Sequence, residues 1–347
     1  MERRDRLVGL LLGQALGDAL GLPLEGLSRE RVARRRAGGR VPGMLFGRLL
    51  VSDDTEHALL TAQALRRRPD FATPFVAALA WRLRWWFISL PPGVGMATAR
   101  ASLRLWLGVP PDASGVDSAG NGPCMRAPVI GLRFAYDENR RMTFVQASTR
   151  LTHTDERALV AARALAEAAA WIGRVDRDLA SLAERLRTCS DARDVEWRAR
   201  IDHLFAAYAR AESVDSVATR LGLGDAVSGF AYDTAPMAIY AWLRHRQDPV
   251  AAIEAAIACG GDTDTVAALT GALVGADVGT RALPREWLGR LADWPLSEKV
   301  LRRVGEALAR DEDVPRRAVW WWWPLMPVRN LLMLLIVLAH GVRRWLR

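Results

Sequence analysis

The chain is poor in several residue types, and each shortage narrows what it can be. Lys299 is the only lysine, a bias that genomic base composition explains better than chemistry specific to arginine. The three cysteines, Cys124, Cys189 and Cys259, are odd in number and form no Cys-x-x-Cys pair, which fits a reduced, cytoplasmic protein. Tyrosine is scarce while alanine and leucine dominate, and this favours helices over sheets.

The net charge of +9 suggests nucleic-acid binding, but its distribution argues against it. Residues 316–347 hold six arginines and no acid, so the chain upstream carries 42 basic against 39 acidic residues. The excess positive charge therefore lies largely in the C-terminal tail. No zinc-finger or RNP pattern accompanies the remaining arginine runs, so we expect no specific nucleic-acid partner.

The N-terminal stretch "MERRDRLVGLLLGQALGDAL" superficially resembles a signal peptide, with arginines followed by leucines. Asp18 interrupts the apolar run, and no small-residue cleavage site follows it. We therefore interpret this stretch as the first helix of the folded protein.

Apolar residues recur at helical spacing along nearly the whole chain, as in the stripe Leu159, Leu165 and Ile172. Alternating strand-like runs flanked by hairpin turns are almost absent. The sequence therefore predicts an all-α, multi-helix globule. The expected helices are 5–20, 54–66, 74–90, 155–172, 177–187, 196–211, 234–244, 249–258, 265–275 and 297–309.

We expect residues 1–300 to form one catalytic domain, because the acidic motifs discussed below lie near both of its ends and must meet. Residues 301–319 would be a helix end and a linker. Residues 320–347 form a tryptophan-rich, apolar and basic tail, with an appended C-terminal helix.

The tail holds a continuous apolar run, 331–339, that is shorter than the roughly 20 residues a membrane-spanning helix needs. Four tryptophans, 320–323, precede this run and arginines follow it, as in anchors at a membrane surface. Two interpretations stay open: attachment to a membrane surface or a partner protein, or a helix docked on the domain or on another subunit.

Two acidic motifs stand at the starts of apolar helical patterns, "SDDTEHALL" at 52–60 and "GGDTDTVAALTGALVG" at 260–275. Either motif alone is plausibly a helix N-terminus, because Asp53 and Glu56 have capping-box spacing. Two motifs supply four carboxylates, far more than capping needs. Facing each other, they would form an oxygen-rich site for Mg²⁺ or Mn²⁺, whereas zinc would call for a His/Cys cluster, which is absent near these acids.

Five stretches in order resemble the ADP-ribosylglycohydrolase family of the dinitrogenase-reductase-activating type: 13–26 ("GQALGDALGLPLEG"), 52–60, 118–132 ("SAGNGPCMRAPVIGL"), 151–159 ("LTHTDERAL") and 260–276. The resemblance covers residues 5 to 290. It implies an all-α orthogonal bundle with two Mg²⁺ or Mn²⁺ ions in a cleft.

The resemblance implies a role for each matching residue. The metal ligands would be Ser52, Asp53, Asp54, Asp262, Asp264 and Thr265, with Asp53 and Asp262 central to catalysis. Glu25 matches a glutamate near the metals that would handle a proton or gate the site. Substrate contacts would come from Gly120, Asn121, Gly122, Arg126, His153 and Tyr232, although Arg126 could instead brace its loop, His153 could cap it, and Tyr232 could serve packing.

The sequence departs from the family pattern at two places. Glu56 and His57 follow the acidic pair where the family often has a neutral polar residue. Pro123 and Cys124 replace small or hydroxyl residues in the glycine loop. Neither departure removes a proposed ligand.

These features predict a glycosidase-type hydrolase that releases ADP-ribose from a protein side chain or a small acceptor. Two alternatives stay open: a pseudo-enzyme that only binds ADP-ribose, and a metal-dependent hydrolase of another nucleotide or glycoside on the same scaffold.

Overall fold

The computed structural model describes residues 1–37, 43–310 and 316–345, with side chains to residue 339, and it confirms the all-α prediction. Within these ranges there are only isolated β-bridges and no strand. The helices and their bounds are α1 (Arg3–Gly21), η1 (Leu22–Leu24), α2 (Arg29–Arg36), α3 (Asp53–Arg67), α4 (Ala72–Ile88), α5 (Met96–Trp106), η2 (Cys124–Arg126), α6 (Ala127–Arg133), α7 (Glu138–Arg150), α8 (Glu156–Gly173), α9 (Leu179–Arg187), α10 (Val195–Ala209), α11 (Val214–Arg220), α12 (Ala231–Arg244), α13 (Pro249–Ala258), α14 (Thr263–Val278), α15 (Arg285–Arg290), α16 (Glu298–Arg310), η3 (Trp323–Leu325) and α17 (Met326–Trp345).

All ten helices expected in the body of the chain are present, with ends shifted by a few residues. The sequence analysis missed α2, α5, α6, α7, α11 and α15. Most of these are short, and α7 is rich in polar residues, so an apolar stripe is hard to see in them. Tertiary contacts stabilise them instead.

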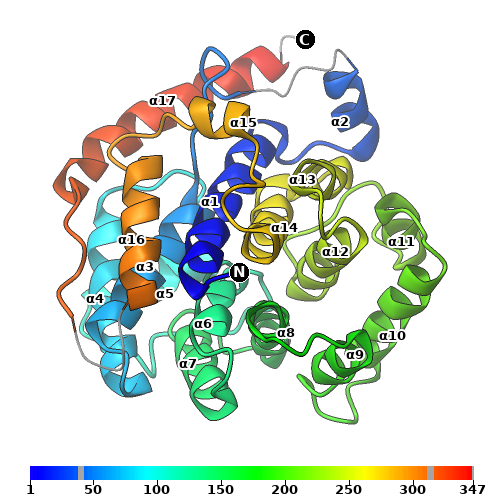
Figure 1. The fold of residues 1–347 in the computed structure, drawn as a ribbon. Helices are drawn as coiled ribbons and strands as arrows, with labels where there is room; N and C mark the ends of the chain where they lie inside the picture. The colour runs from blue at the N-terminus through cyan, green and yellow to red at the C-terminus, as the bar shows by residue number, and fades with distance from the viewer. Residues whose placement is uncertain (38–42, 311–315, 346–347) are drawn as a thin grey trace.

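Helices α1 and α14 run side by side and antiparallel through the middle of the molecule (Figure 1). Their backbones approach closely because glycines face each other: a Cβ atom at Gly13 would lie 2.1 Å from the carbonyl oxygen of Gly271, and one at Gly9 would lie 2.2 Å from that of Gly275. The antiparallel contact brings Gly21, at the end of α1, against Asp264, at the start of α14. Gly21 and Thr263, 242 residues apart in sequence, thereby reach the same end of the bundle.

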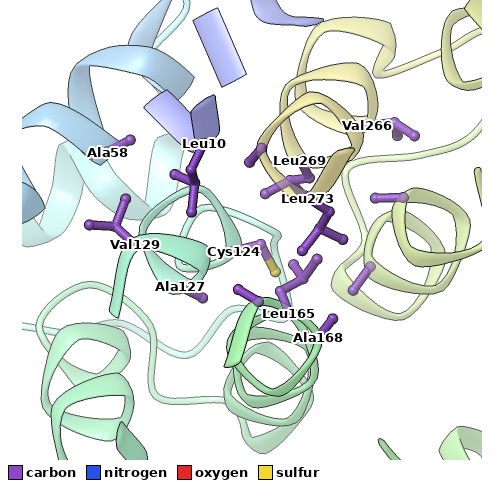
Figure 2. Close-up of a cluster of buried hydrophobic side chains, with 14 of the residues drawn as sticks. Leu10, Ala58, Cys124, Ala127, Val129, Leu165, Ala168, Val266, Leu269 and Leu273 are labelled. Atoms are coloured by element: carbon purple, nitrogen blue, oxygen red, sulfur yellow. The ribbon is translucent and has the colours of Figure 1, made fainter. Parts of the chain in front are cut away.

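The hydrophobic core surrounds this helix pair. Figure 2 shows Leu10 of α1, Leu165 of α8 and Leu273 of α14 pointing toward a common centre, with the thiol of Cys124 among them. Burial raises the pKa of the Cys124 thiol, so it acts as a small apolar side chain. The departure from the family pattern at Cys124 therefore belongs to the core.

Helix α1 and the adjoining η1 are long and apolar enough to cross a membrane, and within the described ranges no other helix passes that test. The passing segment, Arg3–Leu24, is completely buried inside the bundle, as expected of a core helix.

Helix α16 packs on α1 and α3, with Leu301, Val304 and Leu308 fully buried. The boundary that we expected at residue 300 therefore cuts through a helix of the same packed body. The tail helix α17 continues beyond it along the outer edge of the molecule (Figure 1).

We predict that Gly13→Ala lowers the free energy of unfolding by about 1–3 kcal/mol, because the new methyl group collides with the α14 backbone. The gain in helix propensity, about 1 kcal/mol, is too small to offset this clash. Guanidinium unfolding followed by circular dichroism measures the change. Gly289→Ala in α15 is the matched control, because no atom lies within 4 Å of its added Cβ and its stability should hold or rise. Equal effects of the two substitutions would contradict the close-packing argument.

Candidate active site

The first acidic motif opens α3, and Ser52 is the residue that caps this helix. Its hydroxyl oxygen accepts a hydrogen bond from the backbone N–H of Asp54 at 3.3 Å. The capping-box arrangement of Asp53 with Glu56 is therefore wrong, because the helix starts one residue earlier. Asp53 and Asp54 lie in the first turn, where their charges complement the helix dipole.

Asp18 of α1 holds the start of α3 in place. Its carboxylate accepts hydrogen bonds from the backbone N–H groups of Ser52 (2.9 Å) and Thr55 (3.1 Å) and from the Thr55 hydroxyl (2.5 Å). Burial raises the pKa of Asp18 to about 6, although these hydrogen bonds favour the charged form. Because Asp18 accepts hydrogen bonds from these backbone N–H groups, the carboxylates of Asp53 and Asp54 are not needed to cap the helix.

The second acidic motif opens α14 with Asp262 at the N-cap position, yet its carboxylate makes no capping hydrogen bond. The backbone of this loop is held by Leu27, whose carbonyl accepts from Gly261 N–H (2.7 Å), and by Val227, whose carbonyl accepts from Asp262 N–H (2.9 Å). Gly261 has φ +77°, and a Cβ atom there would lie 2.0 Å from the Val227 oxygen. The glycine thus makes the tight loop that presents Asp262.

The two acidic motifs meet in the folded chain. The Thr265 hydroxyl donates a hydrogen bond of 3.0 Å to Asp54 Oδ2, across 211 residues of sequence. The Asn121 amide donates one of 2.5 Å to Asp262 Oδ2, which joins the glycine loop to the same place. Three of the sequence motifs therefore converge on one site.

The carboxylates at this site lie in an unfavourable environment for negative charge. Burial raises the pKa of Asp264 well above its ordinary value, and the charges of Glu25 and Asp262 raise it further. Burial likewise raises the pKa of Asp54, with added repulsion from Asp18 and Asp53. A bound cation would remove this repulsion.

The donor set fits a hard divalent cation. Asp54 Oδ1 and Asp264 Oδ1 are buried oxygens with no hydrogen-bond partner among the described residues, and such atoms need a cation or a donor. Within the described ranges no group of three Asp, Glu, His or Cys side chains is arranged so that it could hold a metal ion. The residues nevertheless supply oxygen atoms of the kind that a hard divalent cation binds.

Glu25 lies at the edge of the same site. It is exposed at the end of η1, and its negative charge contributes to the raised pKa of both Asp53 and Asp264. The neighbouring Gly26 N–H donates to the Gly261 carbonyl at 2.8 Å, which ties the Glu25 loop to the Asp262 loop. This position suits a group that exchanges protons with solvent.

The glycine loop lies over His153. A Cβ atom at Gly122 would be 2.8 Å from His153 Cε1, so the loop can follow the ring only with glycine there. The Thr152 hydroxyl lies 2.9 Å from His153 Nδ1 and also accepts from Arg126. The Thr152 hydrogen can therefore go to Nδ1, which leaves the ring proton on Nε2, beneath the loop. Burial lowers the pKa of His153 to about 3, so the ring is neutral.

Arg126 is a correction to the expected substrate contacts. Its side chain is fully buried, and it donates to Ser148 Oγ (3.0 Å), to the Ser148 carbonyl (3.0 Å) and to Thr152 Oγ1 (2.7 Å), with His57 Nδ1 at 3.0 Å. Because the guanidinium is fully buried and held by these partners inside the protein, it braces the loop and does not reach a phosphate.

Tyr232 is a second correction. Its ring is buried against Trp197, with centroids 4.9 Å apart, and its hydroxyl donates to Asp194. The packing alternative therefore holds, because no face of the ring is left for a base. An aromatic residue whose backbone lies next to the glycine loop is Phe230, which pairs with Gly120, while its ring lies 5.7 Å from that of Tyr232. Its only sequence signal is its place in "SGFAYDT", directly before an apolar helix.

The sequence model of the ADP-ribosylglycohydrolase family matches residues 1–318. The chain belongs to this family.

This chain resembles known proteins over most of its length. It is 27% identical to the ADP-ribosyl-[dinitrogen reductase] glycohydrolase of Rhodospirillum rubrum, over 88% of this chain and 96% of that protein. It is 28% identical to the ADP-ribosylhydrolase ARH3 of Gallus gallus, over 81% and 88%. A solved structure described as an ADP-ribosylglycohydrolase-related protein complex has a TM-score of 0.68, with 29% identity, and covers 89% of this chain and 98% of that one.

The family defines the protein's general activity. It is an enzyme of the ADP-ribosylglycohydrolase type, a hydrolase that acts on ADP-ribose conjugates, and the family is metal-dependent. The family model ends at residue 318, just before the tryptophan-rich tail.

The tail of this ADP-ribosylglycohydrolase explains one departure from the family pattern. Arg329 of α17 is buried and donates to Glu56 Oε1 (2.7 Å) and to Asp293 Oδ1 (2.9 Å). Trp86 Nε1 donates to Glu56 Oε2 at 2.5 Å. Burial raises the pKa of Glu56 to about 7, although Arg329 and Trp86 favour its charged form. The unusual glutamate is thus the binding partner of the added helix.

We predict that Arg329→Met lowers the free energy of unfolding by about 3–5 kcal/mol, because two buried carboxylates lose their cation. Thermal and guanidinium unfolding measure the loss. Adding Glu56→Gln and Asp293→Asn to Arg329→Met should recover part of it. The exposed Arg317 provides the control Arg317→Met, which should change stability little. A stability loss of the same size in this control would contradict the role given to Arg329.

Proposed function

We propose that this enzyme hydrolyses the N- or O-glycosidic bond at C1″ of ADP-ribose attached to a protein side chain or a small acceptor, using two Mg²⁺ or Mn²⁺ ions. Ser52, Asp53, Asp54, Asp262, Asp264 and Thr265 would hold the ions. The observation that carries the proposal is the Thr265–Asp54 hydrogen bond, because it joins the two acidic motifs in one site.

Bound divalent cations would supply positive charge that neutralises the carboxylates and polarises the sugar hydroxyls. The chain's own contribution is rigid placement. Asn121 orients the Asp262 carboxylate and is itself fixed, since its amide also lies 2.9 Å from Thr234 Oγ1. Helices α3 and α14 both direct their N-termini, which carry positive dipole ends, toward the acidic groups.

Glu25 would accept the proton of the attacking water. It is the one exposed carboxylate among those that interact here, so it can return the proton to solvent. Its place at the edge also suits a gating role, in which it moves as substrate enters.

The glycine loop and Phe230 would bind the rest of the ADP-ribose. Gly120 and Gly122 let a diphosphate or ribose approach the backbone, and the neutral His153 beneath them can offer Nε2–H. Phe230 is partly exposed and pairs with Gly120, so its ring would take the stacking role that the buried Tyr232 cannot fill.

The activity can be tested with peptides ADP-ribosylated on arginine or serine and with O-acetyl-ADP-ribose, by mass spectrometry of the released ADP-ribose. Wild-type protein should release it with Mg²⁺ or Mn²⁺ and lose activity in a chelator. Asp262→Asn should lower turnover by about a hundredfold or more, a loss within the range for removing electrostatic stabilisation. The matched control is Asp191→Asn, on the exposed surface. Full activity of Asp262→Asn would refute the site, and binding without release would support the pseudo-enzyme alternative.

Metal binding can be tested without any substrate. We predict that Mg²⁺ or Mn²⁺ raises the melting temperature of the wild-type protein, because binding only to the folded state stabilises it. Asp264→Asn should raise the melting temperature of the metal-free protein, since it removes a buried charge with a raised pKa. It should also abolish most of the increase caused by the cation. If the cation stabilises Asp264→Asn as much as wild type, the ligand assignment is wrong.

A further inference from the structure

The outer face of the tail helix is apolar and uncovered within the described ranges. Helix α17 packs its inner side, with Met333 against Leu22 and Met44, on the body of the enzyme. The opposite side carries an apolar stripe at helical spacing, called the leucine stripe below. It consists of one valine and four leucines whose side chains are 55–57% exposed: Val328, Leu331, Leu332, Leu335 and Leu338. A helix that is apolar on both sides is stable only when both sides are buried, because exposing an apolar face to water is unfavourable.

Exposed tryptophans continue this face from the tail onto α4 and α5. Trp85 is the centre of a ring cluster, with centroid distances of 5.7 Å to Trp81, 5.8 Å to Trp106 and 6.2 Å to Trp323. All four rings are exposed, as are Trp320 and Trp322. Indole rings with one apolar side and one polar N–H favour the boundary between lipid and water.

A cavity of about 1120 Å³ opens in the same face, between α4 and the segment that leads into α17. Its walls include Leu59, Trp86 and Trp321, and its lining also contains Arg67, Arg68 and Arg82. The acid in its lining, Glu56, is paired with Arg329. Apolar walls with arginine side chains in the lining match a molecule that has a hydrocarbon chain and an anionic head.

Two segments of sequence around this face carry mainly positive charge. Residues 58–110, which form α4, α5 and most of α3, contain seven arginines and a single acid, Asp70. Residues 316–347 contain six arginines and no acid. This asymmetry favours a negatively charged partner.

We propose that this face docks on the surface of a bilayer containing anionic phospholipid, with the leucine stripe and the tryptophans in the interfacial layer and the arginines on the lipid phosphates. Buried polar contacts fix α17 to the body of the enzyme. Arg329 pairs with Glu56 and Asp293, and the Asn330 amide donates to the Ser89 carbonyl at 2.9 Å. Docking therefore orients the whole enzyme. This proposal is independent of which linkage the active site cleaves.

A second copy of the chain fits this face less well. A symmetric dimer would place the same surface of each copy against the other, and so would bring arginine-rich margins into contact. Such like charges repel, whereas anionic lipid attracts them.

The test is sedimentation of the full chain with vesicles of phosphatidylcholine alone or of phosphatidylcholine with phosphatidylglycerol. We expect binding to the anionic vesicles, weakened by salt because screening reduces the arginine contribution. The combined variant Leu331→Ser, Leu335→Ser and Leu338→Ser should bind about tenfold or more weakly, since membrane affinity follows buried apolar area. Its hydrolase activity and melting temperature should stay at the wild-type level, because these side chains point away from the body of the protein.

The matched control is Val175→Ser with Val195→Ser, two exposed apolar residues near α9 and α10, on the other side of the molecule in Figure 1. This variant should bind vesicles as wild type does. Failure of the wild-type chain to bind either vesicle, or equal binding of the leucine variant, would overturn the proposal. A dimer in light scattering that the leucine variant converts to a monomer, without vesicle binding, would assign the face to a second copy instead. A stable complex with an acidic protein, again without vesicle binding, would also overturn it.

Discussion

The antiparallel contact between α1 and α14 is the constraint on which the site depends. Glycines along both helices let the two backbones approach so closely that each fixes the other's position along its axis. The end of α1, which leads to Glu25, must then lie beside the start of α14, which carries Asp264. The proposed proton acceptor from the first part of the chain and the proposed cation ligands from the last part are therefore brought together by backbone packing.

Near both acidic motifs, the groups that bind the backbone N–H groups are different from the carboxylates proposed to bind a cation. Ser52 and Asp18 satisfy the N–H groups at the start of α3, and backbone carbonyls of Leu27 and Val227 hold the loop before α14. The aspartates next to these positions are thereby released from capping. Their buried and mutually repelling carboxylates are unfavourable for folding alone, and such groups are typical of functional sites. This division is the physical reason for preferring a cation site over two ordinary helix starts.

The sequence predicted most of the fold, because long apolar stripes such as that of α8 have an unmistakable period. It also predicted that the acidic motifs belong together, through the count of carboxylates and the resemblance to a family. It could not predict which polar side chains near the motifs face inward. Arg126 and Tyr232 have suitable chemistry for a nucleotide, but their partners Ser148, Thr152 and Asp194 are distant in sequence. Phe230 gave no signal beyond its place before an apolar helix, because its position depends on the pairing of its backbone with Gly120.

The inner side of the tail helix α17 stabilises the body of the enzyme, while its outer side forms the proposed docking face. Glu56 follows Asp54 by two residues on α3, and the cation that pairs with it comes from Arg329, beyond the end of the family model. Without α17, Glu56 would lose the cation that pairs with it, beside carboxylates that already repel one another. Deleting the tail would therefore disturb the start of α3 along with any membrane contact. A truncated chain cannot separate these two effects, whereas substitutions on the outer face of α17 leave Arg329 in place and can.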